Sequence, residues 1–538
     1  MENDKYVIGM DFGTLSGRAV LARCADGKIL ASAERKYRHG VMEAFLPDGI
    51  TRLKEGTALQ DPADYPEVLE ALVGELVRES GADPADIIGL AIDFTSCTVL
   101  PVDAEGRPLC SLPAYRNRPH AYVKLWKHHG AQKEAEEIGG KLGEEISSEI
   151  LYPKVLEMLR EDPEVYQASY RILEAADWLT WLLTGSEKRS VSMAGYKAWW
   201  SAENGFPQEG FLAELDERLN GSKLYGEVCP VGKSIGLLNE VWARKLGLSP
   251  RTAVAAGVID SHAGAPGSHI MGKDQLMLVL GTSSVIMAFS EKPFRGMGVY
   301  GTVRDGVIPG YYGLESGVAA VGDALEWFVK SCVPASYYEQ AKEKGLDIYQ
   351  YLTELAGKVD PGKSRVLALD WFNGNKTPYV NTDLTGSLAG LTLQTKPEEI
   401  FRALIEATAF DARQILEIME RSEAEVKIRE VTASGGIAGK NPLILQIYAD
   451  ILQRPVKVAA EPQTAALGSA IYAALAAGKA AGGYDSYREA VNAMSRVRDT
   501  VYMPGEKYRE IYNSKYGNYQ RYGAWMDTFH RREGGDGL

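Results

Sequence analysis

Two segments of the chain share a pattern that restricts the possible folds: an apolar strand, a short turn of glycine and hydroxyl residues, and another apolar strand. They are "IGMDFGTLSGRAVLA" at residues 8–22 and "LMLVLGTSSVIMAFS" at residues 276–290. Helical spacing and a further buried strand follow each of them, so the same order of elements occurs twice. We therefore expect an α/β protein with two domains of one fold.

The length of the chain agrees with two domains, because 538 residues exceed what one ordinary core holds. The pattern places the boundary near residue 270, giving an N-terminal domain at 1–270 and a C-terminal domain at 271–538. Beyond about residue 500 the chain is rich in tyrosine and charge, which predicts a terminal helical tail.

Composition and charge exclude several classes of partner. A formal net charge of −13 offers no basic surplus for a nucleic-acid backbone. The most apolar tract, at 465–478, is short for a membrane span and consists of small residues, which favours a closely packed helix. The five cysteines are scattered without a CxxC pair, and the N-terminus lacks the pattern of a signal peptide. We expect a cytoplasmic protein without nucleic-acid or membrane partners, disulfides or zinc.

The two turns are candidate phosphate-binding elements. Gly13-Thr14 and Gly281-Thr282 each combine a glycine with a hydroxyl donor. Glycine permits positive φ and a close approach to a ligand, and consecutive backbone N–H groups form an anion-binding concavity. A plain hairpin turn is the alternative for either one alone. Because the turns match, we expect them to hold one polyphosphate from two sides.

Asp11 is a candidate magnesium ligand. It ends the first apolar run, just before the turn, where a carboxylate would repel a phosphate unless a cation intervened. Mg²⁺ binds proteins through one or two carboxylates together with substrate phosphates. The alternative is an aspartate that caps the turn.

Asp260 is a candidate general base. It ends the buried run "AVAAGVI", and ligands of open α/β sheets bind beyond the carboxyl ends of strands. A carboxylate there accepts the proton of a hydroxyl that attacks phosphorus. Capping of the following segment is the alternative.

The segment "ASGGIAGKNP" at 433–442 is a candidate site for a flat ring system. Its paired glycines, Gly435 and Gly436, permit close approach, and Asn441 offers donor and acceptor groups. The chain has neither a GxGxxG fingerprint nor a P-loop, which disfavours those two nucleotide folds.

Three further polar residues are ambiguous. Lys197 stands among aromatic residues in "GYKAWW", where it either extends past apolar surface or serves a sugar site. His128 and His129 are adjacent and cannot face one way on a helix, so surface positions are expected for both.

With these motifs the chain resembles the FGGY carbohydrate kinase family of the actin-like ATPase superfamily over nearly its whole length. The segment "GSLAGLTLQTKPEEIFRALIE" matches the C-terminal family signature closely. The other signature is partly present in "SSEILYPKVLEML", where Leu156 replaces the usual tryptophan, so Lys154 is left outside the set of site residues. Segments such as "IDFTSCTVLPVD" and "DWFNGNKTPYVNTDLTG" are most similar to members that phosphorylate L-ribulose.

The resemblance implies two actin-like (ribonuclease H-like) domains with an interdomain cleft. The first domain would bind sugar and the second the nucleotide, with ATP and Mg²⁺ as cofactors. Asp11 would hold Mg²⁺ through water, and Asp260 would be the catalytic base. The implied nucleotide-binding residues are Gly13, Thr14, Gly281, Thr282, Gly435, Gly436 and Asn441. The implied sugar-binding residues are Ser96, Lys197, Asp260 and Glu315.

The expected reaction is ATP-dependent phosphorylation of the small sugar L-ribulose to its 5-phosphate, in arabinose catabolism. A kinase for another pentulose or pentitol, such as ribitol or xylulose, is the nearest alternative. A nucleotide-driven chaperone or filament protein on the same scaffold is another, although the chain lacks a separate peptide-binding domain. The oligomeric state stays open, with a homodimer as one arrangement.

Overall fold

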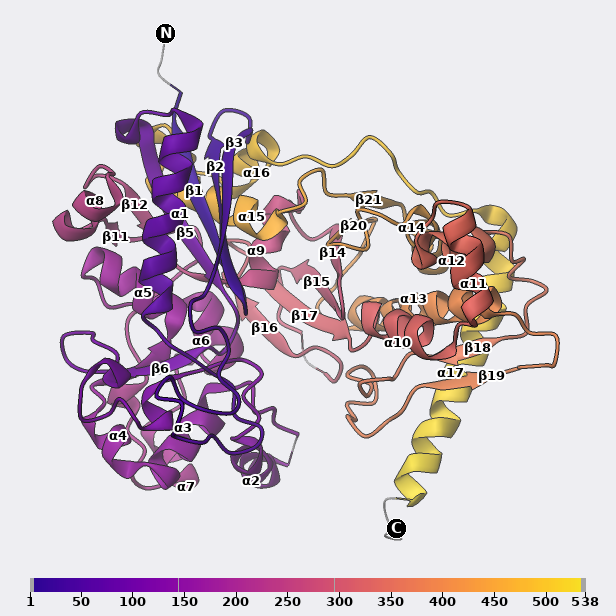
Figure 1. Ribbon diagram of the computed structural model, residues 1–538, viewed down its shortest axis with the longest axis horizontal. Helices are drawn as coiled ribbons and strands as arrows, with labels where there is room; N and C mark the ends of the chain where they lie inside the picture. Colours follow the sequence, from indigo (N-terminus) through magenta and orange to yellow (C-terminus); the bar gives the residue numbers. More distant parts are fainter. Residues whose placement is uncertain (1–3, 144, 295, 534–538) are drawn as a thin grey trace. The chain divides into compact units, whose positions relative to one another are not determined.

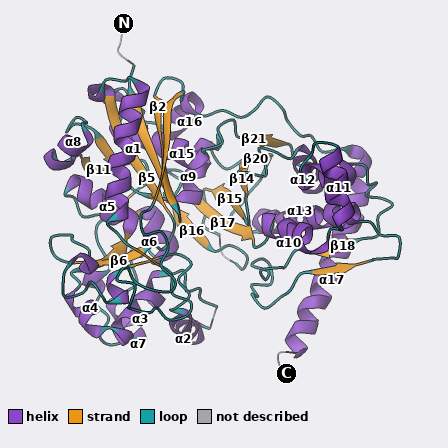
Figure 2. Ribbon diagram, viewed as in Figure 1, coloured by secondary structure: helices purple, strands orange, loops and turns teal. Residues whose placement is uncertain are grey.

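A computed structural model describes residues 4–143, 145–294 and 296–533 (Figure 1). The chain forms two compact units. Unit 1 comprises the chain up to Met271 together with Val303–Gly313 and Gln463–Arg496, and unit 2 comprises Gly272–Thr302, Leu314–Pro462 and the chain from Val497 on. Strands and helices alternate in both (Figure 2), so the predicted α/β class is confirmed. The return of Gln463–Arg496 to unit 1 is a feature that our division at residue 270 does not contain, and that division stays a prediction.

Unit 1 is built on a mixed sheet with the strand order β11-β12-β5-β1-β2-β3, in which β13 also pairs with β5. Strands β1 and β2 are antiparallel, whereas β1 and β5 are parallel. The strands of unit 1 are β1 (Tyr6–Phe12), β2 (Ser16–Arg23), β3 (Ile29–Lys36), β4 (Leu59–Gln60), β5 (Ile87–Phe94), β6 (Val99–Val102), β7 (Val123–Lys124), β8 (Arg171–Glu174), β9 (Arg189–Ser190), β10 (Val228–Cys229), β11 (Ser234–Leu237), β12 (Ala253–Ala255) and β13 (Val258–Ile259).

Helices cover both faces of this sheet. The helices of unit 1 are α1 (Asp64–Ser80), α2 (Gln132–Leu142), α3 (Leu151–Glu161), α4 (Pro163–Ala168), α5 (Ala175–Thr184), α6 (Val191–Lys197), α7 (Glu209–Leu215), α8 (Glu240–Leu246), α9 (Asp260–Gly267), α15 (Thr464–Ala477) and α16 (Tyr487–Met494). A Cβ at Gly9 would meet α15, and a Cβ at Gly17 would meet Val68 of α1. Because Gly9 pairs with Val20 and side chains alternate along a strand, Gly9 and Gly17 point to opposite faces.

Helix α15 is the closely packed helix expected from the apolar tract. Its residues from Ala466 to Ala474 are all buried. Cβ atoms added at Gly9 of β1 and Gly89 of β5 would lie 1.9 Å and 2.5 Å from carbonyl oxygens of this helix. Only glycine permits that approach, so the small residues of the strands and the helix together place α15 directly on the sheet.

A second part of unit 1 consists of the antiparallel sheet β4-β7-β6-β8 with helices α2, α3, α4 and α7. Its separate apolar core includes Val99, Tyr152, Leu156 and Ile172.

Unit 2 repeats the hairpin of unit 1. Strands β14 and β15 are antiparallel, and β14 pairs in parallel with β20. The sheet order is β16-β17-β15-β14-β20-β21. The strands are β14 (Gln275–Leu280), β15 (Ser284–Ser290), β16 (Gly301–Arg304), β17 (Tyr312–Val318), β18 (Leu367–Leu369), β19 (Ser387–Ala389), β20 (Glu430–Ser434) and β21 (Val456–Val458). The helices are α10 (Gly322–Cys332), α11 (Ala335–Glu343), α12 (Ile348–Gly357), α13 (Pro397–Arg421), α14 (Pro442–Leu452) and α17 (Arg509–Glu533).

The expected helical tail is α17. It contacts Glu406, the last residue of the segment that resembles the C-terminal family signature. Glu406 of α13 is buried and accepts hydrogen bonds from Arg402 Nε at 2.8 Å and from Tyr512 Oη at 3.2 Å. Lys515 of α17 also pairs with Glu406. The most specific family motif therefore anchors the terminal helix within unit 2.

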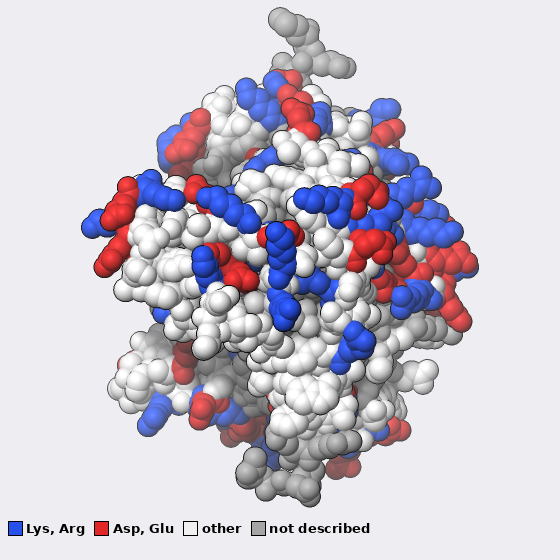
Figure 3. All heavy atoms as spheres, turned by 90° about the vertical axis from the view of Figure 1, so that its right-hand side faces the viewer, with Lys and Arg blue, Asp and Glu red and all other residues white. Residues whose placement is uncertain are grey.

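Figure 3 shows one face of the molecule, on which basic and acidic side chains are interspersed. No continuous basic surface is visible among the described residues on that face. Within the part of the chain that the structure describes, no helix combines the length and apolarity needed to cross a membrane.

Candidate active site

The carboxyl ends of three parallel strands bring the acidic candidates of unit 1 to one edge of the sheet. Asp11 of β1 lies opposite Asp93 of β5, and Val258 of β13 pairs with Asp93 on the other side. Asp260 follows β13 directly and is the first residue of α9. The backbone N–H of Ser261 donates to Asp260 Oδ1 at 2.7 Å. The edge thus carries three carboxyl groups from three neighbouring strands.

Asp93 was not among the residues that we singled out, yet it lies directly beside Asp11. Each carboxyl group acts on the ionisation of the other, and Ser469 Oγ of α15 donates to Asp93 Oδ2 at 2.6 Å, whereas Asp93 Oδ1 is buried without another partner among the described residues. Burial raises the pKa of Asp93 well above its usual value, and the neighbouring charge of Asp11 adds to this effect. Burial also raises the pKa of Asp11, whereas the hydrogen bond with Asp93 and the charge of Arg18 oppose it. The arrangement favours a protonated Asp93 that donates to an Asp11 carboxylate.

The first glycine turn is held by four hydrogen bonds. The N–H of Gly13 donates to Ser16 O at 3.1 Å, and Tyr37 Oη donates to Gly13 O at 2.8 Å. Gln60 Nε2 donates to Thr14 O at 2.8 Å, and Trp126 Nε1 donates to Thr14 Oγ1 at 3.0 Å. Because the Thr14 hydroxyl accepts from the indole, its own proton is available to an incoming acceptor. The hydroxyl of Thr14 is therefore held by the fold and can still donate to a ligand.

The turn that carries Ser96 follows β5 at the same edge of the sheet. Thr95 Oγ1 and Thr98 Oγ1 are hydrogen-bonded at 2.7 Å, and Thr98 N donates to Glu174 Oε2 at 2.9 Å. Burial raises the pKa of Glu174 to about 8.

Lys197, the last residue of α6, lies near this turn. Its positive charge acts on the ionisation of Cys97 and of Glu174. Ser192 of the same helix accepts a hydrogen bond from Ile259 N at 3.3 Å, directly before Asp260. Three of the four sugar-binding candidates, Ser96, Lys197 and Asp260, therefore gather at one end of unit 1.

The nucleotide candidates of unit 2 converge in the same way. Val279 of β14 pairs with Ser434 of β20, so the two strands deliver Gly281 and Gly435 at the same edge. Gly435 has φ of 91°, and a Cβ there would lie 2.5 Å from Leu280 O. Gly436 has open space around it.

The second glycine turn resembles the first in its closure. Gly281 N donates to Ser283 O at 3.0 Å, and the N–H of Gly322 at the start of α10 donates to Gly281 O at 3.0 Å. Neither Gly13 nor Gly281 adopts the positive φ that glycine permits. A Cβ at either position would make only ordinary contacts with the protein. Because glycine has no side chain, a ligand can come close to the backbone of both turns.

The side chain of Asn441 already has partners. Its Oδ1 accepts from Ile444 N at 3.2 Å and caps α14, and its Nδ2 donates to Thr353 Oγ1 at 3.0 Å. An amide offers two donors and two acceptor sites, so half of its capacity is used. Glu315 lies on β17 in unit 2, where its carbonyl accepts from Tyr300 N at 2.8 Å.

The part of the chain that the structure describes holds no group of three or more His, Cys, Asp or Glu side chains arranged for a metal ion. A magnesium ion bound mainly by substrate phosphates and one carboxylate needs no such group. The partly exposed Asp11, at the end of β1 and next to the glycine turn, fits that requirement.

Comparison with known proteins identifies the family. Residues 6–267 match the N-terminal domain, and residues 276–477 the C-terminal domain, of the FGGY family of carbohydrate kinases. The chain belongs to the FGGY family. A ribulokinase of Halalkalibacterium halodurans is 45% identical to this FGGY protein, covering 96% of this chain and 94% of the relative. A ribulokinase of Geobacillus thermodenitrificans is 44% identical, covering 98% and 95%.

Solved structures support the actin-like fold of this FGGY protein. The xylulose kinase from Rhodospirillum rubrum superposes with a TM-score of 0.82 at 23% identity, covering 98% of this chain and 99% of that one. A gluconate kinase from Lactobacillus acidophilus gives a TM-score of 0.80 at 19% identity, covering 99% and 100%. At these identities the likeness concerns the fold, and the predicted pair of actin-like domains is confirmed.

The structure corrects the position expected for His128 and adds to the sequence interpretation of Lys154 and Asp93 in the FGGY protein. His128 is buried, not on the surface, and hydrogen-bonds through Nε2 to Glu157 at 2.8 Å. Lys154 was set aside but is fully buried beside the Ser96 turn. The repeated pattern of an apolar run ending in "DF", at Asp11 and at Asp93, was the available signal for Asp93.

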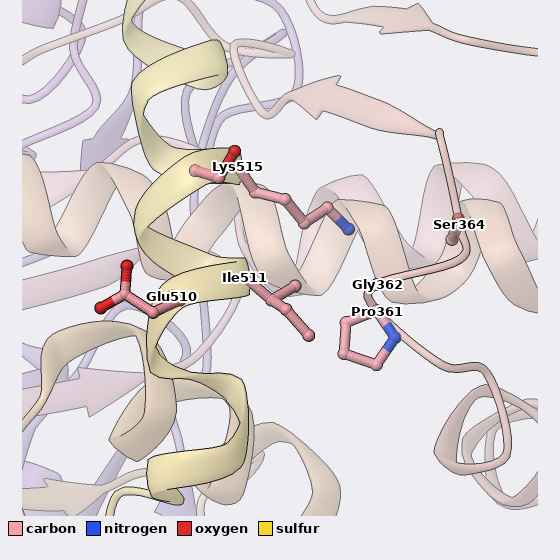
Figure 4. Close-up of a pocket in the computed structure, with 7 residues that line it drawn as sticks. Pro361, Gly362, Ser364, Glu510, Ile511 and Lys515 are labelled. Carbon is pink, nitrogen blue, oxygen red and sulfur yellow. The ribbon is translucent and has the colours of Figure 1, made fainter.

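A pocket in unit 2 lies between the loop at 361–364 and α17 (Figure 4). Its lining residues are Pro361, Gly362, Ser364, Glu510, Ile511, Ser514 and Lys515. None of them is a candidate site residue, so this pocket adds nothing to the candidate active site.

Proposed function

We propose that the protein transfers the γ-phosphoryl group of ATP to the terminal hydroxyl of L-ribulose, giving L-ribulose 5-phosphate and ADP in arabinose catabolism. The observation that carries this proposal is the identity of 43–45% to four ribulokinases over nearly the full chain. The convergence of Ser96, Lys197 and Asp260 at one end of unit 1 supports a sugar site there, to which we add Glu315 of unit 2.

Asp260 is the proposed base. Its carboxylate accepts the proton as the sugar oxygen forms a bond to the γ-phosphorus and the bond between that phosphorus and the bridging oxygen of ADP breaks. Phosphoryl transfer needs little covalent help from the protein, so its main tasks are positioning and neutralisation of charge.

The nucleotide contacts are proposed at the turns Gly13-Thr14 and Gly281-Thr282 and at Gly435, Gly436 and Asn441. Backbone N–H groups and hydroxyls of the turns donate to phosphate oxygens, and the open surface at Gly436 admits the adenosine. Asp11 would hold Mg²⁺ through water, and the ion when bound neutralises charge on the phosphates. A protonated Asp93, opposite Asp11 on the neighbouring strand, would donate to the Asp11 carboxylate and hold it in place.

An assay of ADP release across L- and D-ribulose, ribitol, and L- and D-xylulose tests the proposal. We expect the highest kcat/KM with L-ribulose. A higher value with ribitol or a xylulose would reassign the substrate, and ATP turnover that responds to unfolded peptide but to no sugar would overturn the kinase assignment.

We also propose a cytosolic location, supported by five cysteines that are all unpaired. The homodimer stays a prediction, which light scattering of the purified protein tests.

A further inference from the structure

Lys154 of α3 makes an unusual set of contacts for a buried charge. Its side chain is fully buried, and its Nζ donates to two main-chain carbonyls, Cys97 O at 2.5 Å and Leu125 O at 2.6 Å. Burial of an ammonium is costly unless its protons are satisfied, and it is most often satisfied by a carboxylate. Here two main-chain carbonyls accept the hydrogen bonds of the ammonium instead.

Each of these two segments leads into the candidate active site. Cys97 directly follows Ser96 and has φ of 49°, a left-handed conformation that is uncommon for a side-chain-bearing residue. Leu125 directly precedes Trp126, whose indole N–H holds the Thr14 hydroxyl. One ammonium therefore joins the turn of a sugar candidate to the segment that holds a phosphate candidate, all within unit 1.

We propose that Lys154 is a positioning residue that fixes the position of the Ser96 turn relative to the Thr14 turn for phosphoryl transfer. The inference rests on the proposed function of these turns. A displacement of about 1 Å at the reacting groups costs roughly 100-fold in rate. Lys154 touches neither substrate, and it acts through Cys97 and through Trp126.

Other lysines of unit 1 show what a merely structural role looks like. Lys124 is also buried, but its Nζ pairs with the carboxylate of Glu157. Lys223 donates to the main-chain carbonyls of Gln167 and Ser169, as Lys154 does with its own pair, but at a site that holds no candidate residue. Lys223, which is half-buried, is therefore the control, because its Nζ also donates to two carbonyls but has no link to the turns.

The test compares Lys154→Met, Lys154→Arg and Lys223→Met with the wild type, using the pentulose that gives the highest kcat/KM. We expect Lys154→Met to lower kcat/KM for the sugar by about 10- to 100-fold, with partial recovery in Lys154→Arg, which keeps donors at the position. Lys223→Met keeps the wild-type constants. A lowered melting temperature with unchanged kcat and KM in folded Lys154→Met would overturn the proposal.

Trp126→Phe tests the same link if Lys154→Met does not fold, because it removes the N–H that donates to Thr14 and keeps an aromatic ring at the position. We expect a fall in kcat of at least about fivefold at an unchanged melting temperature, and an unchanged kcat would overturn the link. Absence of any sugar phosphorylation by the wild type would instead overturn the proposed function. Direct binding of L-ribulose, measured by calorimetry, then decides about Lys154: weaker binding to Lys154→Met than to the wild type supports its role, and equal binding or none to either protein overturns it.

Discussion

Asp11 of β1 and Asp93 of β5 lie opposite each other on two parallel strands, close enough for each carboxyl group to act on the ionisation of the other. Two ionised carboxylates at that distance would repel, so one proton shared by the pair stabilises the arrangement. Ser469 of α15 satisfies Asp93 from the other side. Asp93, which contacts only the protein, therefore positions Asp11, the proposed magnesium ligand.

Substitution of Asp93 tests this support. Asp93→Asn keeps an acceptor for Ser469 and a donor for Asp11, so we expect kcat and the Mg²⁺ dependence within about threefold of the wild type. Asp93→Ala removes the acceptor for Ser469 and the carboxyl group beside Asp11, and we expect a loss of about 10- to 100-fold in kcat or in apparent Mg²⁺ affinity. Titration of activity with Mg²⁺ measures both, and equal behaviour of the two variants would contradict the role.

Asp260→Asn separates binding from chemistry. The amide preserves the shape and the acceptor for Ser261 N but accepts no proton from the sugar. We expect nucleotide affinity near that of the wild type and a loss in kcat of about 100- to 10,000-fold. Calorimetry with ADP and steady-state kinetics check the two parts, and near-normal turnover by a folded variant would refute the base.

Glu174→Gln should change how stability depends on pH. Burial raises the pKa of Glu174 to about 8, so the folded state holds its proton more tightly than the unfolded chain. The stabilisation that protonation provides is complete below about pH 4 and is lost progressively as the pH rises through 8. Glu174→Gln does not lose this stability as the pH rises, because glutamine does not titrate.

We therefore expect the melting temperature of Glu174→Gln to rise relative to the wild type between about pH 5 and pH 8, by the equivalent of a few kcal/mol. Thermal unfolding of both proteins over this range is the measurement. Asp177, which has a pKa raised by burial to about 7, is present in both and serves as the internal control. Parallel curves would contradict the ionisation of Glu174 in the folded protein.

Alanine substitutions at the two paired glycines of unit 2 are expected to differ in their effect on stability. Gly435→Ala would place a Cβ 2.5 Å from Leu280 O at a φ of 91°, so we expect a loss in stability of about 1–3 kcal/mol. Gly436→Ala meets open space and should leave the melting temperature unchanged. If adenosine passes close to this backbone, Gly436→Ala weakens ADP binding without unfolding the protein. Unaltered affinity would remove Gly436 from the nucleotide site.

Much of the site could be predicted from local pattern. Each apolar run that ends in an acidic residue or a glycine turn forms a strand whose end carries that residue, as Asp11, Asp260 and Gly281 show. The physical reason is that alternation, apolarity and turn chemistry act over a few neighbouring residues. The backbone conformation of the turns could not be predicted from the pattern. Positive φ occurs at Gly435 but at neither Gly13 nor Gly281.

The sequence by itself determined that the chain has two similar halves, where each places its glycine turn, and which strand ends bear carboxylates. Only the tertiary structure decided that Ser469 reaches Asp93 from 376 positions away, that Gln463–Arg496 pack in unit 1, and that Lys154 bonds the backbone at Cys97 and Leu125. Such contacts depend on burial and on which elements meet in space, and no spacing along the chain encodes them.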